Sequence, residues 1–81
     1  MTVNHAVAQR IWSLLEEKEM TQYRLEQKSG IQHGSLQCIM NDRNKTVTLT
    51  TILQLARGFD MTPAEFLDDD IFLSETLETE K

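Results

Sequence analysis

Hydrophobic residues recur at helical spacing near the start of the chain. Apolar side chains that follow the 3.6-residue period of an α-helix predict an amphipathic helix over roughly residues 4–18. Four of them share one face of that helix: Val7, Ile11, Leu14 and Leu15. No stretch of alternating β-branched residues favours a strand. The pattern therefore predicts an all-α protein.

Two short helices are expected next. Thr21 is a good N-cap and Gly30 supplies a left-handed stop, which together predict a helix over residues 22–29. A third helix is expected to start near Gln32 and to run to Met40. Its inward stripe is formed by three residues: Leu36, Ile39 and Met40.

Two further helices follow a polar loop. Thr48 is expected to cap a fourth helix that ends at Gly58, after which Phe59 folds back on Leu53. The inward residues of this helix are expected to be Ile52, Leu53 and Leu55. The clearest helix start in the chain is Thr62-Pro63-Ala64-Glu65, which combines an N-cap, a proline at the first helical position and the acid of a capping box.

Composition limits what such a chain can be. Its 81 residues suffice for one domain, and its single cysteine, Cys38, rules out an internal disulfide. We find no metal-spaced group of cysteines or histidines, no apolar run of membrane-spanning length and no signal peptide. These features predict a cytoplasmic protein without a structural metal.

The net charge of −5 argues at first against a nucleic-acid partner, but the charge is unevenly distributed. Residues 1–60 carry seven basic and six acidic side chains, whereas residues 61–81 carry one basic and seven acidic ones. We therefore divide the chain into a mildly basic domain, residues 1–67, and an acidic tail, residues 68–81. Because the tail also contains apolar residues, we hypothesise that it packs on the bundle or on a second protomer. Those apolar residues are Ile71, Phe72, Leu73 and Leu77.

The second and third predicted helices form a helix-turn-helix, and the segment Met20–Leu36, MTQYRLEQKSGIQHGSL, resembles the Cro/CI-type (XRE) repressor family. The resemblance continues through NDRNK, LTTILQLA and MTPAEFL and covers about residues 7–67. It implies a compact five-helix bundle of the lambda-repressor-like DNA-binding type. The chain departs from the family pattern at Glu19 and Asp42, where glycine is usual, and at Glu26, where a small residue is common.

The resemblance implies that the third helix enters the DNA major groove. The base-reading residues would be Gln32, His33, Gly34, Gln37 and Cys38. Helical geometry agrees for three of these, because an inward stripe of Leu36, Ile39 and Met40 turns Gly34, Gln37 and Cys38 outward. Gln37 would read adenine and His33 would donate to a guanine edge. Phosphate contacts are expected from Gln22, Arg24, Arg43, Asn44, Lys45 and Thr46.

Simpler interpretations account for other conspicuous residues. Trp12, Phe59 and Phe66 are expected to be packing residues, and Cys38 has no sequence neighbour that would activate its thiol. No catalytic motif is present, so we expect no enzyme activity, no cofactor and no small-molecule substrate.

The sequence thus predicts a bacterial or phage-derived transcriptional regulator, a repressor that binds a palindromic double-stranded DNA site as a homodimer. Two alternatives stay open. The chain could be the antitoxin of a toxin–antitoxin pair, with a protein partner held by the acidic tail. It could also be a protein-interaction module that uses the same bundle without DNA.

Overall fold

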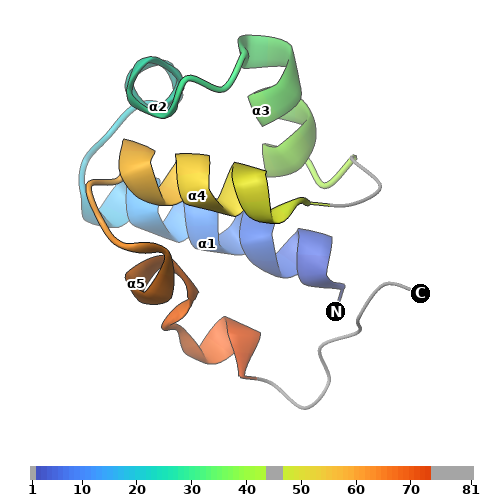
Figure 1. Cartoon of the computed structure of the whole chain (residues 1–81). Coiled ribbons are helices and arrows are strands. Elements are labelled where there is room, and N and C mark those ends of the chain that lie inside the picture. The colour runs from blue at the N-terminus through green and yellow to red at the C-terminus, as the bar shows by residue number, and fades with distance from the viewer. Residues whose placement is uncertain (1, 44–46, 74–81) are drawn as a thin grey trace.

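The computed structural model of the chain describes residues 2–43 and 47–73, which fold into helices and turns without a strand. Figure 1 shows α1 and α4 crossing the middle of the molecule, with α2 and α3 on one side and α5 on the other. The predicted all-α, five-helix fold is confirmed. A short 3₁₀ turn, η1, follows the fifth helix. The bounds are α1 Val3–Glu17, α2 Gln22–Ser29, α3 His33–Met40, α4 Leu49–Gly58, α5 Pro63–Leu67 and η1 Asp70–Phe72.

Threonine caps start three of the helices where the sequence predicted them. The hydroxyl oxygens of Thr21, Thr48 and Thr62 each accept a hydrogen bond from the backbone N–H three residues ahead, at 3.1–3.2 Å. At α5 the Glu65 carboxylate also accepts from the backbone N–H of Thr62 at 2.8 Å, which completes the capping box. Gln32 caps α3 with its backbone alone, because its side chain makes no capping hydrogen bond.

Three helices end in the same left-handed turn. Glu19, Asp42 and Asp60 follow α1, α3 and α4 with φ values of 51°, 57° and 59°. In each turn the next residue donates its backbone N–H to a carbonyl five positions earlier, at 2.8–2.9 Å, as in a Schellman ending. Glu19 and Asp42 therefore keep the backbone conformation that glycine would adopt with less strain.

The predicted end of α4 at Gly58 is confirmed, and the left-handed turn that follows lies at Asp60. The predicted inward face of this helix was wrong at one residue. Leu53, expected to face inward, is 43% exposed, while Leu55 and Phe59 are fully buried. The helix is therefore rotated so that Leu53 lies at its solvent edge.

Gly58 has a different structural role, at the crossing of α2 and α4. A Cβ atom at this position would lie 2.7 Å from Leu25 Cδ1 and 2.9 Å from Ser29 Cβ. These distances are shorter than packed side chains tolerate. The absence of a side chain at Gly58 thus permits the close approach that places α2 on α4.

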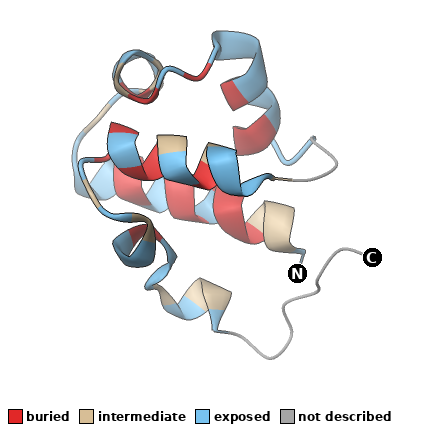
Figure 2. Ribbon diagram, viewed as in Figure 1, coloured by how far each residue is buried: buried red, intermediate tan, exposed pale blue. Residues whose placement is uncertain are grey.

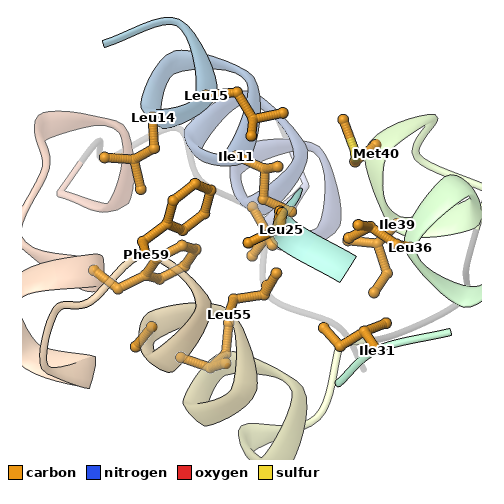
Figure 3. Close-up of a cluster of buried hydrophobic side chains, with 14 residues drawn as sticks. Ile11, Leu14, Leu15, Leu25, Ile31, Leu36, Ile39, Met40, Leu55 and Phe59 are labelled. Atoms are coloured by element: carbon orange, nitrogen blue, oxygen red, sulfur yellow. The ribbon is translucent and has the colours of Figure 1, made fainter. Parts of the chain in front are cut away.

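A single apolar core joins the helices. Figure 2 shows the buried positions facing the interior of the bundle, and Figure 3 shows side chains of α1, α2, α3 and α4 meeting there. Ile11, Leu25, Leu36 and Leu55 are each fully inaccessible to solvent. One contiguous core of this kind is what positions α2 and α3 relative to each other.

Among the aromatic residues expected to pack, Phe59 and Phe66 are fully buried and have ring centroids 6.4 Å apart. Trp12 differs from expectation because it is 53% exposed. Its indole N–H donates to the backbone carbonyl of Met40 at 3.0 Å, which ties α1 to the end of α3.

The start of the acidic segment packs against the bundle. Phe72 in η1 is partly buried, with its ring centroid 6.2 Å from that of Phe66. Ile71 is also partly buried, whereas Leu73 is 72% exposed. Leu77 and the rest of residues 74–81 lie outside the described residues, so the proposed division at residue 67 and the role of the tail stay predictions.

Candidate nucleic-acid interface

The turn between α2 and α3 is built from local hydrogen bonds around one glycine. Gly30 has φ 79° and donates its N–H to the carbonyl of Glu26 at 3.0 Å. The hydroxyl of Ser29 accepts from the N–H of Ile31 at 3.1 Å, and the Ile31 side chain enters the core. The turn therefore fixes the angle between two short helices, as in a helix-turn-helix.

One face of α3 is free of the protein's own packing. Leu36, Ile39 and Met40 are buried, as predicted. The residues proposed to read bases are all exposed: Gln32, His33, Gly34, Gln37 and Cys38. A Cβ atom at Gly34 would meet nothing within 4 Å, so the fold does not require glycine there. The exposed face of α3 is thus available to a partner.

The proposed phosphate-binding residues are only partly described. Gln22 is the first residue of α2, and Arg24 is exposed in the same turn, where its backbone N–H is occupied by the Thr21 cap. Arg43 is exposed just after α3, and its backbone N–H donates to the carbonyl of Cys38 at 2.8 Å. Asn44, Lys45 and Thr46 lie outside the described residues. Cationic side chains therefore follow α3 and start α2, positions that suit phosphate contacts in a helix-turn-helix.

A chain of polar side chains crosses from α2 to α3. The Glu26 carboxylate accepts from the Gln22 amide at 3.1 Å and contacts His33 Nδ1 at 2.6 Å through the same oxygen, Oε2. His33 Nε2 lies 3.4 Å from the Gln37 amide nitrogen. The Gln37 amide oxygen in turn accepts from the Asn41 amide at 3.0 Å. We call these five residues the polar relay.

Two members of the polar relay, Glu26 and Asn41, were not among the predicted site residues. Their positions follow a spacing of four, since Glu26 lies four residues after Gln22 and Asn41 four after Gln37. That spacing is visible in the sequence. The contact between Glu26 and His33 is not, because it depends on the angle between two different helices.

The carboxylate of Glu26 is largely sheltered. Its side chain is 14% exposed, against 66% for that of His33, so the acid lies beneath the histidine. The arrangement keeps an acidic group out of the outermost layer of the α3 face, where it would repel a polyanion.

An ion pair fastens α2 to the end of α4 beside this surface. Lys28 of α2 donates to the Asp60 carboxylate. This hydrogen bond, together with the charges of Lys28, Lys18 and Arg24, holds the pKa of Asp60 below its usual range. The pair neutralises one of the basic side chains of α2 and leaves the exposed Arg24 as the basic group in the first turn of that helix.

Other kinds of site find no support in the described part of the chain. Residues 2–43 and 47–73 contain no group of three or more histidine, cysteine or acidic side chains placed to hold a metal ion. Within the same residues, no helix has the length and hydropathy needed to cross a bilayer. Cys38 is a free, exposed thiol on α3.

The fold and the exposed α3 face together define a helix-turn-helix protein. A family model described as the Cro/C1-type HTH DNA-binding domain matches residues 10–70, and the chain therefore belongs to this family. No curated protein and no solved structure gives a match to the chain. Family membership supports DNA binding by a transcriptional regulator.

Proposed function

We propose that this protein is a sequence-specific transcriptional repressor that binds a palindromic double-stranded DNA operator as a homodimer. The observation that carries the proposal is the division of α3 into two faces. Leu36, Ile39 and Met40 enter the core, while His33, Gly34, Gln37 and Cys38 are exposed. This is the second helix of the helix-turn-helix, the one that lies in the major groove when such motifs bind DNA. The major groove of B-DNA is wide enough to admit such a helix with its polar face toward the base edges.

Within this proposal, Gln37 reads an adenine through its amide, and Gln32, His33 and Cys38 border the same base pairs. Packing does not require glycine at position 34, because nothing lies within 4 Å of an added Cβ. Within this proposal Gly34 instead lets the α3 backbone approach the groove closely. The phosphates on either side of the major groove are contacted by Gln22, Arg24 and residues 43–46.

A homodimer follows from the small size of one reading head. Eight residues of α3 contact few base pairs, whereas two copies on an inverted repeat bind with the affinity of linked sites. Half-sites would lie about 34 Å apart, one turn of DNA, because both α3 helices must enter the groove from one side of the duplex.

The test is selection from a pool of random DNA duplexes by the purified full-length protein at about 0.1 M salt, where long-range electrostatic binding is partly screened. Enrichment of an inverted repeat is the expected result. Gln37→Ala should then lose the preference at one base pair of each half-site. Gln9→Ala, at an exposed glutamine of α1, serves as the matched control and should keep every preference.

The same selection separates the interaction module from the proposed repressor, whereas the antitoxin is separated by its binding to a toxin. An antitoxin would also enrich an operator, but it would in addition bind a toxin encoded by a neighbouring gene through its acidic tail. A protein-interaction module would enrich nothing and would bind DNA only without sequence preference at low salt. That second outcome would contradict the proposed function.

A further inference from the structure

The relay between α2 and α3 has a defined hydrogen-bond direction. An ionised carboxylate only accepts, so the contact between Glu26 and His33 requires a proton on Nδ1 of the histidine. In the neutral imidazole the other nitrogen, Nε2, is then an acceptor. It therefore receives the N–H of the Gln37 amide, which lies 3.4 Å away.

The same direction continues along α3. With its nitrogen turned toward His33, Gln37 presents its amide oxygen to Asn41, whose amide donates to it at 3.0 Å. Asn41 also donates to the backbone carbonyl of Gln37 at 2.9 Å, which holds the asparagine in place. The Gln37 amide is thus oriented from both ends.

This orientation leaves half of the Gln37 amide unused. A glutamine side chain has two N–H donors and two oxygen lone pairs, and the relay occupies one of each. One donor and one acceptor remain, which is the pair that a bidentate contact with adenine N7 and N6 requires. Orienting the amide in advance spares part of the entropy lost when it binds the base.

We propose that Glu26 is a positioning residue for base recognition, acting through His33 to hold the Gln37 amide in the orientation that reads adenine. The inference rests on the proposed function, because it assigns a role within that DNA contact. Glu26 touches no base. Its side chain is 14% exposed and lies beneath His33. Its negative charge should oppose DNA binding in general.

Glu26 thus has two effects on DNA binding: it improves discrimination through Gln37, and its negative charge lowers affinity for any DNA. Because the two effects have opposite signs, the positioning role can be measured separately. In Glu26→Gln the lost negative charge should leave affinity for non-specific DNA unchanged or raised. Discrimination at the base pair read by Gln37 should fall about two- to tenfold, the effect of freeing one ordered side chain. A variant that merely weakened the fold would lower both affinities.

The experiment compares dissociation constants for the selected operator and for the operator altered at the base pair that Gln37→Ala identifies. Wild type, Glu26→Gln and Glu26→Ala are measured, the last because a small residue is common at this position in the family. Glu17→Gln removes the same charge at an exposed site on α1 and should leave discrimination unchanged. Thermal melting verifies that each variant is folded.

Nitrogen-15 NMR of the His33 ring provides a readout independent of DNA. At a pH where the ring is neutral, wild type should show the Nδ1–H tautomer. Glu26→Ala should lose that preference, and Glu26→Gln should weaken it, because a neutral amide oxygen is a poorer acceptor than a carboxylate. Unchanged discrimination in both Glu26 variants, or a wild-type ring protonated at Nε2, would overturn the inference while the selected operator still upheld the proposed function. If wild type enriches no operator, the proposed function fails and the positioning role fails with it.

Discussion

Arg10 donates from its guanidinium Nε to the backbone carbonyl of Phe66 at 2.7 Å, across 56 positions of the chain. The same side chain reaches the carbonyl of Glu65 at 2.9 Å and the Asp69 carboxylate at 3.1 Å, and its guanidinium lies 5.8 Å from the Phe66 ring centroid. Arg10 is only 8% exposed. One arginine of α1 therefore satisfies the carbonyl end of α5 and anchors the segment that follows it.

Replacing Arg10 should be costly for stability. Arg10→Ala removes the guanidinium donors of the Phe66 and Glu65 carbonyls and leaves Glu65 with only the backbone N–H of Asp68 at 3.2 Å. We expect the free energy of unfolding to fall by about 2–4 kcal/mol. Arg10→Lys should recover only part of the loss, because an ammonium cannot reproduce the planar fork. Urea unfolding measures both. Arg57→Ala, at an exposed arginine of α4, is the control and should change the free energy of unfolding little. An equally small effect of Arg10→Ala would contradict the anchoring role.

Gly58→Ala should destabilise the protein although alanine is the better helix former. The added methyl would lie 2.7 Å from Leu25 Cδ1, so α2 and α4 must separate or Leu25 must move. We expect a loss of about 1–3 kcal/mol in unfolding free energy, typical of overpacking. If propensity alone decided the outcome, the variant would instead gain up to about 1 kcal/mol, and such a gain would show that the crossing relaxes freely.

Gly34→Ala should separate stability from function. Because nothing lies within 4 Å of the added Cβ, we expect α3 to be stabilised by about 0.5–1 kcal/mol. Affinity for the selected operator should nevertheless fall about fivefold or more, since the methyl would occupy the space between backbone and groove. Ser35→Ala, at the neighbouring exposed position, is the control. Undiminished operator binding by a more stable Gly34→Ala would refute the close approach.

The ion pair between Lys28 and Asp60 predicts a pH dependence of stability. The pKa of Asp60 is lowered in the folded protein, chiefly by the hydrogen bond from Lys28. Its contribution is therefore present above the unfolded aspartate value, about 3.9, and is lost as the pH falls through the lower folded value. Asp60→Asn removes the charge but tolerates the left-handed backbone. Wild type should be the more stable near pH 7, and unfolding curves of the two proteins should converge near pH 2. A difference that persisted in acid would have another cause.

Helix starts were predictable because their determinants are local. Thr21, Thr48 and Thr62 each cap a helix with a hydroxyl bonded three residues ahead, and such a contact is encoded within four residues of sequence. Gly30 likewise indicates the left-handed end of α2. The outward face of α3 followed from the period of its apolar residues.

What the sequence did not reveal depends on contacts between helices. Gly58 was correctly interpreted as the end of α4, but its close packing against Leu25 and Ser29 of α2 was not predicted. Trp12 was assigned to packing, yet its position is decided by the Met40 carbonyl at the end of α3. Glu26 was noted only as a departure from the family pattern, because its partner His33 belongs to the next helix.

The indole of Trp12 is also an intrinsic fluorescent probe of the protein. It is the sole tryptophan of the chain, half-exposed, and bonded to the last residue of α3. It also lines a surface groove together with Gln22, a proposed phosphate contact. Its emission therefore reports on the packing of α3 against α1 and on the neighbouring edge of α2, so unfolding and DNA titration can both be followed by intrinsic fluorescence without attaching a label.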